Sequence, residues 1–347
     1  MNIQSRDSIN HLLQHPVLVP GYRVITTADD MVTLRWLSHT FVLRGAVVPI
    51  VLELIALMDG TKDITQLAEQ LHLSPRQLTQ ILLRLYQAKL IVDKADLIDS
   101  SDKKFGVASA LSQIHYPYKD YSHTSYRNLQ QQAILVVGSQ DLTQMVRDQI
   151  EQTGLERIQN CLGSELASEQ IRQFAPTFIL HLERAIDYHT TLQINEIALN
   201  LNVPWVTGWL AGTTINITHV MIPGENACFE CLLLRLRENY INFDADLAYE
   251  QFLRNNQDDL SFQISTPSID NLLVSLVSMR AITHLIGYVP LLPAPKLIEF
   301  STIDLIGTEH PVLRIPRCPA CGAFTFHART NPYVDDFRRS FQTEKDR

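Results

Sequence analysis

Cys228-Phe229-Glu230-Cys231 is one of two C-x-x-C motifs in this sequence, and Cys318-Pro319-Ala320-Cys321 is the other. Two residues between cysteines allow both thiolates of a motif to turn toward one point, and two such motifs supply the four sulfurs of a tetrahedral zinc site. Because residues 232–317 separate the motifs, the metal would join the ends of a domain instead of folding a short finger. The pattern predicts a structural zinc on Cys228, Cys231, Cys318 and Cys321.

Two disulfides, four plain thiols or a redox pair are the alternatives for these cysteines. Residues 1–14 are polar and lack the apolar core of a secretory signal, which disfavours disulfides. A redox C-x-x-C usually occurs singly, next to the start of a helix after a strand. The fifth cysteine, Cys161, has no cysteine near it in sequence, and we expect an ordinary half-buried thiol there.

The composition is that of a globular protein. The chain has 347 residues, of which 46% are hydrophobic, so two domains are expected. A net charge of -8 argues against a nucleic-acid scaffold. The longest apolar run, residues 46–58, contains Pro49 and Glu53 and is too short to span a bilayer. We therefore expect a cytoplasmic protein that binds neither nucleic acid nor membrane.

The first domain is predicted over residues 16–94. Its apolar patterns indicate three strands, three helices and a closing strand, in that order. Ser74-Pro75 is a start signal for the third helix, because serine caps a helix and proline suits its first position. The strands are expected at 22–25, 31–36 and 39–43, the helices at 47–58, 64–71 and from 75 onward, and the last strand at 90–92. This order is typical of a small winged-helix domain.

A winged helix commonly binds DNA, but the charge disfavours that function here. Residues 1–94 hold nine Lys or Arg and eight Asp or Glu, whereas DNA binding needs a clustered basic face. A peptide can instead add as a strand to the sheet edge, against the third helix. DNA binding and a purely structural role remain open. The predicted peptide-binding residues are Thr40, Phe41, Val42 and Leu43 on the third strand and Arg76, Thr79, Gln80, Leu83 and Arg84 on the third helix.

A polar linker is predicted over residues 95–130, and a second domain over 131–330. The second domain begins with a buried strand at 133–138, a turn and a helix at 141–153, as a nucleotide-binding unit does. The turn keeps Gly138 but lacks the other two glycines of G-x-G-x-x-G, and Asp141 places a carboxylate where a phosphate would lie. ATP binding by this chain is therefore not expected.

The remainder of the second domain alternates strands and helices, which indicates a Rossmann-like α/β sheet. Strands are predicted at 178–182, 203–208, 215–222 and 312–316, and helices at 190–201 and 271–286, the last capped by Asp270 or Asn271. Glu183, Arg184 and Asp187 follow a strand, at the edge where such sheets usually bind ligands. Residues 331–347 are predicted to be a polar tail.

One part of the second domain consists of Val203-Pro204-Trp205-Val206-Thr207-Gly208, an alternating strand, Pro223-Gly224 and the first C-x-x-C. This part resembles ThiF-like adenylating enzymes. Residues 309–322, which run from Glu309-His310-Pro311 through the second C-x-x-C, are similar to one branch of that family. The branch comprises the ThiF-like partner proteins of azoline-forming peptide biosynthesis, which carry an N-terminal winged-helix peptide-recognition element. The resemblance covers about residues 16–325.

The resemblance implies a non-catalytic recognition subunit. It would bind the leader of a ribosomally made precursor peptide and present it to a separate YcaO-type cyclodehydratase, which binds ATP and forms thiazoline or oxazoline rings. An ATP-dependent adenylating enzyme that acts on a peptide carboxylate is the first alternative, and a zinc-stabilised DNA-binding regulator is the second. A homodimer is suggested by the resemblance alone.

Overall fold

In a computed structural model, the chain divides into two compact units, Met1–Arg127 and Asn128–Arg347. The structure describes residues 13–28, 30–36, 39–97, 129–166, 168–255, 265–286 and 295–322. The predicted tail at 331–347 and most of the predicted linker lie outside these residues.

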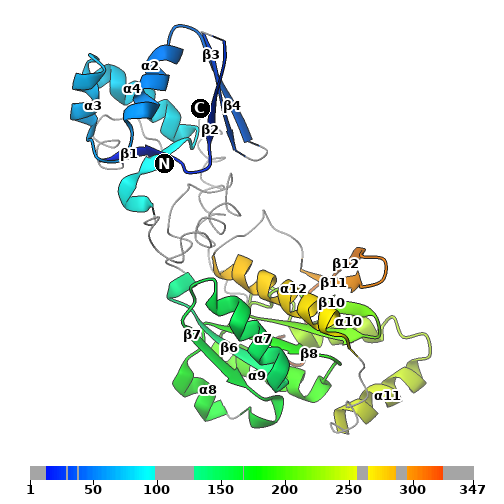
Figure 1. Cartoon of the computed structure of the whole chain (residues 1–347). Coiled ribbons are helices and arrows are strands. Elements are labelled where there is room, and N and C mark those ends of the chain that lie inside the picture. Colours follow the sequence, from blue (N-terminus) through cyan, green and yellow to red (C-terminus); the bar gives the residue numbers. More distant parts are fainter. Residues whose placement is uncertain are drawn as a thin grey trace, which may run out of the picture. The chain divides into compact units, whose positions relative to one another are not determined.

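A three-stranded antiparallel sheet forms part of the first unit (Figure 1). Its order is β2 (Arg23–Ala28), β3 (Met31–Trp36) and β4 (His39–Arg44), so β2 and β4 are both edge strands. A second pair of strands, β1 (Pro16–Leu18) and β5 (Ile91–Asp93), is antiparallel. Alternation along β3 buries Val32, Leu34 and Trp36 on one face, as period-two strands do.

Three helices, α2 (Val48–Leu57), α3 (Ile64–Gln70) and α4 (Pro75–Gln87), complete the core of this unit. The helices α3 and α4 each begin with a capping box, at Asp63 and Ser74, which satisfies backbone donors of the first turn. The α4 side chains Leu78, Leu82 and Leu85 follow helical spacing and are buried. A short 3₁₀ helix, η1 (Lys94–Asp96), follows β5.

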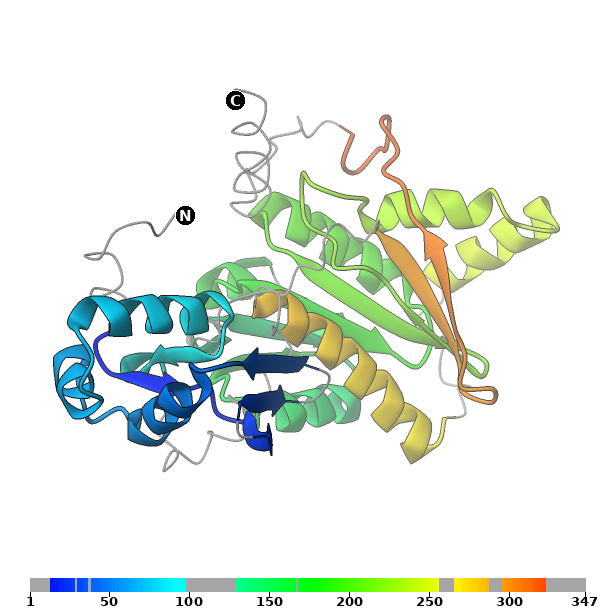
Figure 2. The ribbon, with the colours of Figure 1, turned by 90° about the horizontal axis from the view of Figure 1, so that it is seen from above.

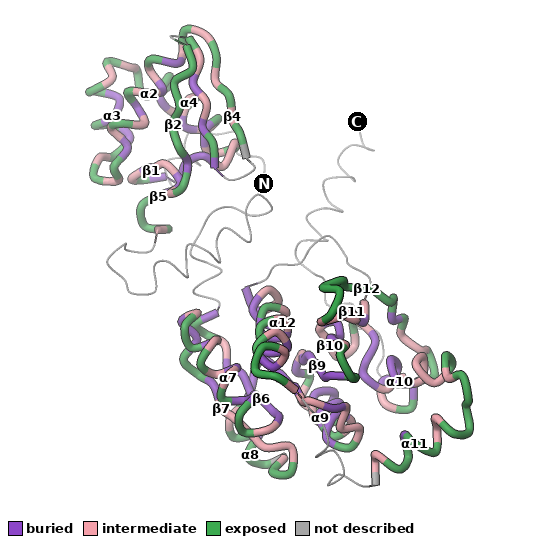
Figure 3. Tube along the Cα trace, turned by 45° about the vertical axis from the view of Figure 1, so that its right-hand side comes forward, coloured by how far each residue is buried: buried purple, intermediate pink, exposed green. Residues whose placement is uncertain are grey.

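The second unit is built on a seven-stranded mixed sheet of order β12-β11-β10-β9-β8-β6-β7. The parallel half contains β6 (Ala133–Gly138), β7 (Arg157–Cys161), β8 (Phe178–Glu183) and β9 (Trp205–Ala211). The antiparallel half contains β10 (Thr214–Ile217), β11 (Lys296–Ser301) and β12 (Gly307–Pro311). Figure 3 shows the contrast between the buried β6 and the exposed edge strand β12.

Helices cover both faces of this sheet, as Figures 1 and 2 show. The helices α7 (Gln140–Glu151) and α12 (Pro267–Leu285) contact each other and lie on one face. The helices α8 (Ser168–Phe174), α9 (Tyr188–Leu201) and α10 (Phe229–Arg237) share a core on the opposite face. Helix α11 (Phe243–Asn255) contacts α9, and a 3₁₀ helix, η2 (Gly163–Glu165), follows β7.

The structure corrects the predicted elements at several places. The strand predicted at 312–316 is wrong, because the strand ends at Pro311 and an irregular segment leads to the second C-x-x-C. The strand predicted at 215–222 stops at Ile217. The predicted cap at Asp270 or Asn271 is also wrong, since Thr266 accepts the hydrogen bond from the Ile269 N–H and starts α12 one turn earlier.

Other predicted elements are confirmed with small boundary shifts. The strands β3 and β6 have the predicted bounds, and α4 begins at the predicted Pro75. Among the residues that the structure describes, no helix has the length and apolar character needed to cross a membrane.

Candidate functional site

The four cysteines of the two C-x-x-C motifs converge in the second unit. Cys228 is the N-cap of α10 and Cys231 lies in its first turn, while Cys318 and Cys321 come from the turn after residues 312–317. Their sulfur atoms all lie within 4.8 Å of one another, and all four residues are buried. These four residues are called the cysteine cluster below.

The distances within the cysteine cluster fit a tetrahedral metal ion. The Cys228 Sγ is 3.8 Å from the Cys231 Sγ and 3.7 Å from the Cys318 Sγ, and the Cys231 Sγ is 3.5 Å from the Cys321 Sγ. Sulfurs bound to one zinc at about 2.3 Å lie about 3.8 Å apart. The four thiols can therefore hold a metal ion such as zinc.

The backbone around the cysteine cluster is arranged to support the sulfurs. The Ile315 N–H donates to the Cys231 Sγ at 3.4 Å. Arg314 donates to the carbonyl oxygens of Cys321 and Gly224, at 2.7 and 3.1 Å, and so links the second motif to the segment that precedes the first. A Cβ at Gly322 would lie 2.5 Å from the Cys318 carbonyl oxygen, so the turn requires glycine. These contacts orient the sulfurs without using their remaining valence.

Crowding shifts the pKa values of these thiols in opposite directions, because hydrogen bonds from Cys228 and Cys231 lower the pKa of the Cys321 thiol. Hydrogen bonds with Cys231 and Cys321, and then burial, raise the pKa of the Cys228 thiol above its usual range. A metal ligand must be a thiolate, so metal binding displaces protons from the cluster.

A second group of polar residues gathers where β6 meets α7, at the position of the predicted nucleotide turn. Gly138 is required there for packing, because a Cβ would lie 2.3 Å from the carbonyl oxygen of Leu182 on β8. The Glu183 carboxyl lies close to this turn, and the Ser139 backbone at the start of α7 favours its ionised form and so lowers its pKa. A carboxyl group of the protein thus lies at the helix end that would otherwise bind an anion.

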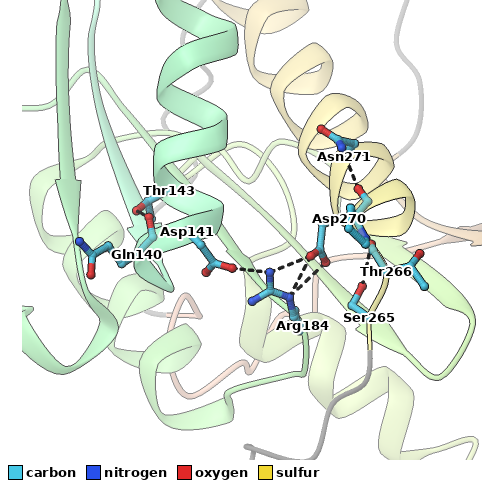
Figure 4. Close-up of polar contacts among 9 residues, drawn as sticks. Gln140, Asp141, Thr143, Arg184, Ser265, Thr266, Asp270 and Asn271 are labelled. Atoms are coloured by element: carbon cyan, nitrogen blue, oxygen red, sulfur yellow. Dashed lines mark hydrogen bonds and ion pairs between the residues drawn. The ribbon is translucent and has the colours of Figure 1, made fainter.

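Arg184 closes this end of the sheet with two ion pairs (Figure 4). Its guanidinium donates to both carboxylate oxygens of Asp270, with the Nη2–Oδ2 distance at 2.7 Å, and to the Asp141 carboxylate from the first turn of α7. The Asp270 side chain is 10% exposed, whereas that of Asp141 is 58% exposed. The three residues link α7, the end of β8 and α12, because Arg184 directly follows β8. We call them the Arg184 cluster.

The pKa values follow from these contacts. Burial and the nearby Asp187 raise the pKa of Glu183 to about 7. The Arg184 hydrogen bond lowers the pKa of Asp141 to about 2. At neutral pH the start of α7 therefore has an ionised Asp141 and a partly ionised Glu183 beside it, and both repel a phosphate.

The sequence pattern places Glu183 and Arg184 at the ligand edge but gives no sign of the ion pairs. Asp270 lies 86 positions from Arg184 in sequence, and its place near a predicted helix start indicates only a cap. A buried acid one turn inside an apolar helix is the signal that could have found it, because such a carboxylate needs a partner.

The predicted peptide-binding residues lie on β4 and α4 of the first unit. Phe41 and Leu43 are half-buried and pack against the core of the unit, together with Leu83 of α4. Thr40 and Val42 point to the opposite, exposed face of the sheet. On α4, Arg76, Gln80 and Arg84 are exposed, and the Thr79 hydroxyl donates to the Pro75 carbonyl oxygen at 2.7 Å.

Comparison with known proteins gives a fold and no family. The sequence matches no family model and no curated protein. Among solved structures, the chain is similar to the heterocyclase TruD, with a TM-score of 0.68 and 17% identity over 89% of this chain and 43% of that one. A heterocyclase in complex with substrate and cofactor gives 0.66 and 18% over 89% and 39%. The chain thus spans about two fifths of those two chains.

A third similar structure is E. coli MccB with succinimide, with a TM-score of 0.61 and 10% identity over 89% of this chain and 99% of that one. MccB has also been solved with ATP. At these identities the likeness shows a shared fold.

Proposed function

We propose that this chain is a non-catalytic recognition subunit in the biosynthesis of ribosomally made, modified peptides. Its first unit acts as a winged-helix domain that binds the precursor's leader, and its second unit is a ThiF-type Rossmann-like domain with a structural zinc on the cysteine cluster. The resemblance at residues 203–232 and 309–322 supports this proposal, as does the fold shared with two heterocyclases.

One observation carries the choice of a non-catalytic role: the anion-binding end of α7 is filled by the protein's own carboxyl groups. A nucleotide phosphate at the Ser139 N–H would have to approach the carboxyl groups of Glu183 and of the ionised Asp141. Arg184, a cation at this end of the sheet, already bonds to Asp141 and Asp270. The ATP would then be bound by the partner, a YcaO-type cyclodehydratase that forms azoline rings in the core peptide.

The leader would add as a strand along β4. This edge is regular, because β3 and β4 pair over six consecutive residues, whereas a register shift between Thr26 and Ala28 interrupts the pairing of β2. Bulges of that kind protect an edge from strand addition. Phe41, Leu43 and Leu83 are half-buried and would supply apolar contacts for the inward side chains of the added strand. If the strand lies against α4, Arg76, Thr79, Gln80 and Arg84 would supply its polar contacts.

Titration calorimetry with Mg-ATP tests the choice of role, with the metal content measured on the same sample. We expect no heat of binding up to millimolar ATP, together with measurable binding of a precursor leader and stimulation of a YcaO-type cyclodehydratase from the same organism. Micromolar ATP binding would overturn the non-catalytic role. It would favour an adenylating enzyme, the function that the fold shared with ATP-bound MccB makes the second candidate.

A further inference from the structure

The three strands β2, β3 and β4 carry positive charge and no negative charge. Their charged residues with described side chains are Arg23, Arg35 and Arg44, and the strands contain no Asp or Glu. All three arginines are exposed. Within the described part of the chain, none of their guanidinium groups has an ion-pair or hydrogen-bond partner.

The strand register places these arginines on one face of the sheet. Arg35 lies opposite Arg23 on β2 and opposite Thr40 on β4, and Met31 lies opposite Arg44. Residues 31, 33 and 35 of β3 alternate with the buried 32, 34 and 36, so this is the face away from the core. It is called the outer face below.

The outer face is arranged in three rows that run across the strands. Arg23, Arg35 and Thr40 form one end row, and Met31 and Arg44 form the other. The middle row is Ile25, Thr33 and Val42, in which Ile25 is 43% exposed and Val42 is 44% exposed. The face is therefore cationic at both ends and apolar between them.

This arrangement opposes the stability of the isolated sheet. Like charges directly opposite each other on neighbouring strands destabilise the pair, and Arg23 and Arg35 are such a pair. The exposed parts of Ile25 and Val42 are apolar surface left in water. A bound polypeptide with carboxylates and an apolar side chain would offset both effects.

The proposal rests on the proposed function, in which a peptide adds to β4. An added strand lies about 4.8 Å from β4, and its side chains alternate between the two faces. Side chains opposite Thr40, Val42 and Arg44 would lie on the outer face, two residues apart from one another. Those opposite Phe41 and Leu43 would point inward, toward the apolar core side.

Charge complementarity then defines the ligand. A carboxylate opposite Arg44 can form a charge-assisted pair. A carboxylate opposite Thr40 can reach Arg35, which lies one strand further in, because the threonine between them is small. We propose that the outer face selects an extended acidic peptide with two carboxylates four residues apart and apolar side chains at the three positions between them.

A nucleic acid is a poorer occupant of the same face. The net charge of residues 1–94 is only +1, and nucleic-acid binding depends on many phosphate contacts. A pattern that alternates with strand period also fits a peptide strand better than a phosphate backbone.

The test uses the full chain and short fluorescent peptides. The probe contains Glu-Val-Leu-Val-Glu, a matched probe has glutamine at both ends, and a spacing control, Glu-Val-Leu-Glu-Val, places its carboxylates on opposite faces. We expect binding of the first probe, with affinity at least about tenfold lower for either control. Equal binding of the three probes, or no binding of the first, overturns the inference.

Three arginine variants locate the peptide. Removing one charge should weaken binding most for Arg44→Gln on the edge strand, by about tenfold, less for Arg35→Gln, and by under about twofold for Arg23→Gln, which is two strands, or about 10 Å, from β4. Lys62→Gln, which removes a half-buried cation paired with Asp59, should have no effect. Melting temperatures of the four variants check that each is folded.

Each contrary result has a distinct meaning. The reverse order of effects would put the peptide on the β2 edge, and equal effects would indicate general attraction to positive charge; both overturn the inference. Competition by duplex DNA with a steep salt dependence would replace the peptide by a nucleic acid and also overturn it. If a precursor leader binds but none of the arginine variants weakens it, the inference fails while the proposed function stands. If no leader binds at all, the proposed function itself fails.

Discussion

The cysteine cluster and the Arg184 cluster occupy the same unit and invite the same question, whether a ligand belongs there. In the cysteine cluster, four buried thiols of one kind face a common centre. In the Arg184 cluster, one cation lies between two carboxylates, and the charges satisfy one another. A group of polar residues suggests a ligand when its members cannot neutralise or coordinate one another. Which residue types are present matters more for this than where the group lies in the fold.

Removal of a sulfur should have the largest effect. We expect Cys231→Ser to lose the metal and to destabilise the second unit by several kcal/mol, because structural zinc binding contributes about 10–16 kcal/mol in small metal-dependent folds. That loss corresponds to a fall in melting temperature of at least about 10 °C. Metal content by mass spectrometry and thermal unfolding measure it. Leader binding by the first unit should persist.

Cys161→Ser is the matched control, since Cys161 is half-buried and outside the cluster. A chelator should lower the melting temperature of the wild type but not that of Cys231→Ser. If Cys231→Ser kept its full metal content and stability, the cysteine cluster would not be a structural metal site.

Removal of the central cation should have the next largest effect. Arg184→Gln leaves the largely buried Asp270 without a cation, which we expect to cost about 2–3 kcal/mol after allowance for the 27% exposure of Arg184. Urea unfolding measures the change. The control is Arg147→Gln, whose partner Glu151 lies on an exposed helix face, with an expected cost below about 0.5 kcal/mol. Equal costs would mean that the Arg184 cluster is an ordinary surface ion pair.

The Glu183 carboxyl should make the stability of the folded protein depend on pH. Its pKa is about 7 in the folded protein and 4.5 as a free side chain, so the folded state binds a proton more tightly. The associated stability is complete below pH 4.5 and is lost as the pH rises to about 7. We expect Glu183→Gln to be about 1–3 kcal/mol more stable than the wild type at pH 8 and equal to it at pH 4. A stability difference that is the same at both pH values would contradict this account.

Asp141→Asn should have the smallest effect. Asp141 is more than half exposed, so solvent screens its pair with Arg184 and the expected cost is below about 1 kcal/mol. Because the pKa of Asp141 is lowered to about 2, its contribution is present above pH 3.8 and is lost as the pH falls toward 2. Asp141→Asn combined with Glu183→Gln removes both negative charges from the start of α7. Calorimetry measures phosphate binding by this double variant. If the variant binds phosphate and the wild type does not, the two negative charges alone prevent binding.

Local patterns in the sequence predicted the parts of the fold that depend on neighbours along the chain. The capped start of α4 and the buried strand β6 are examples, because hydrophobic periodicity and cap residues act over a few positions. The missed strands β11 and β12 are different. β11 pairs with β10 across more than 80 positions, so no local pattern indicates that pairing. β12 is exposed at every residue and therefore lacks the alternation of buried and exposed residues that marks a strand.

The two clusters differ in the same way. The C-x-x-C spacing made the cysteine cluster visible, because paired thiols at short intervals are typical of metal and redox sites. The Arg184–Asp270 contact joins residues whose types are common at surfaces, so only the packing of α12 against the sheet brings them together.

Segment 232–317, which lies between the two pairs of cysteines, has a consequence for the order of assembly. A metal ion on the cysteine cluster closes a loop of nearly 90 residues that includes α10, α11, α12, β11 and β12. Closing a loop of that length in an unfolded chain costs several kcal/mol of entropy, roughly 4–5 by analogy with a disulfide, so a chain without its sheet captures the metal poorly. We therefore expect the sheet to form before a metal binds, and a bound metal to slow unfolding more than it speeds folding.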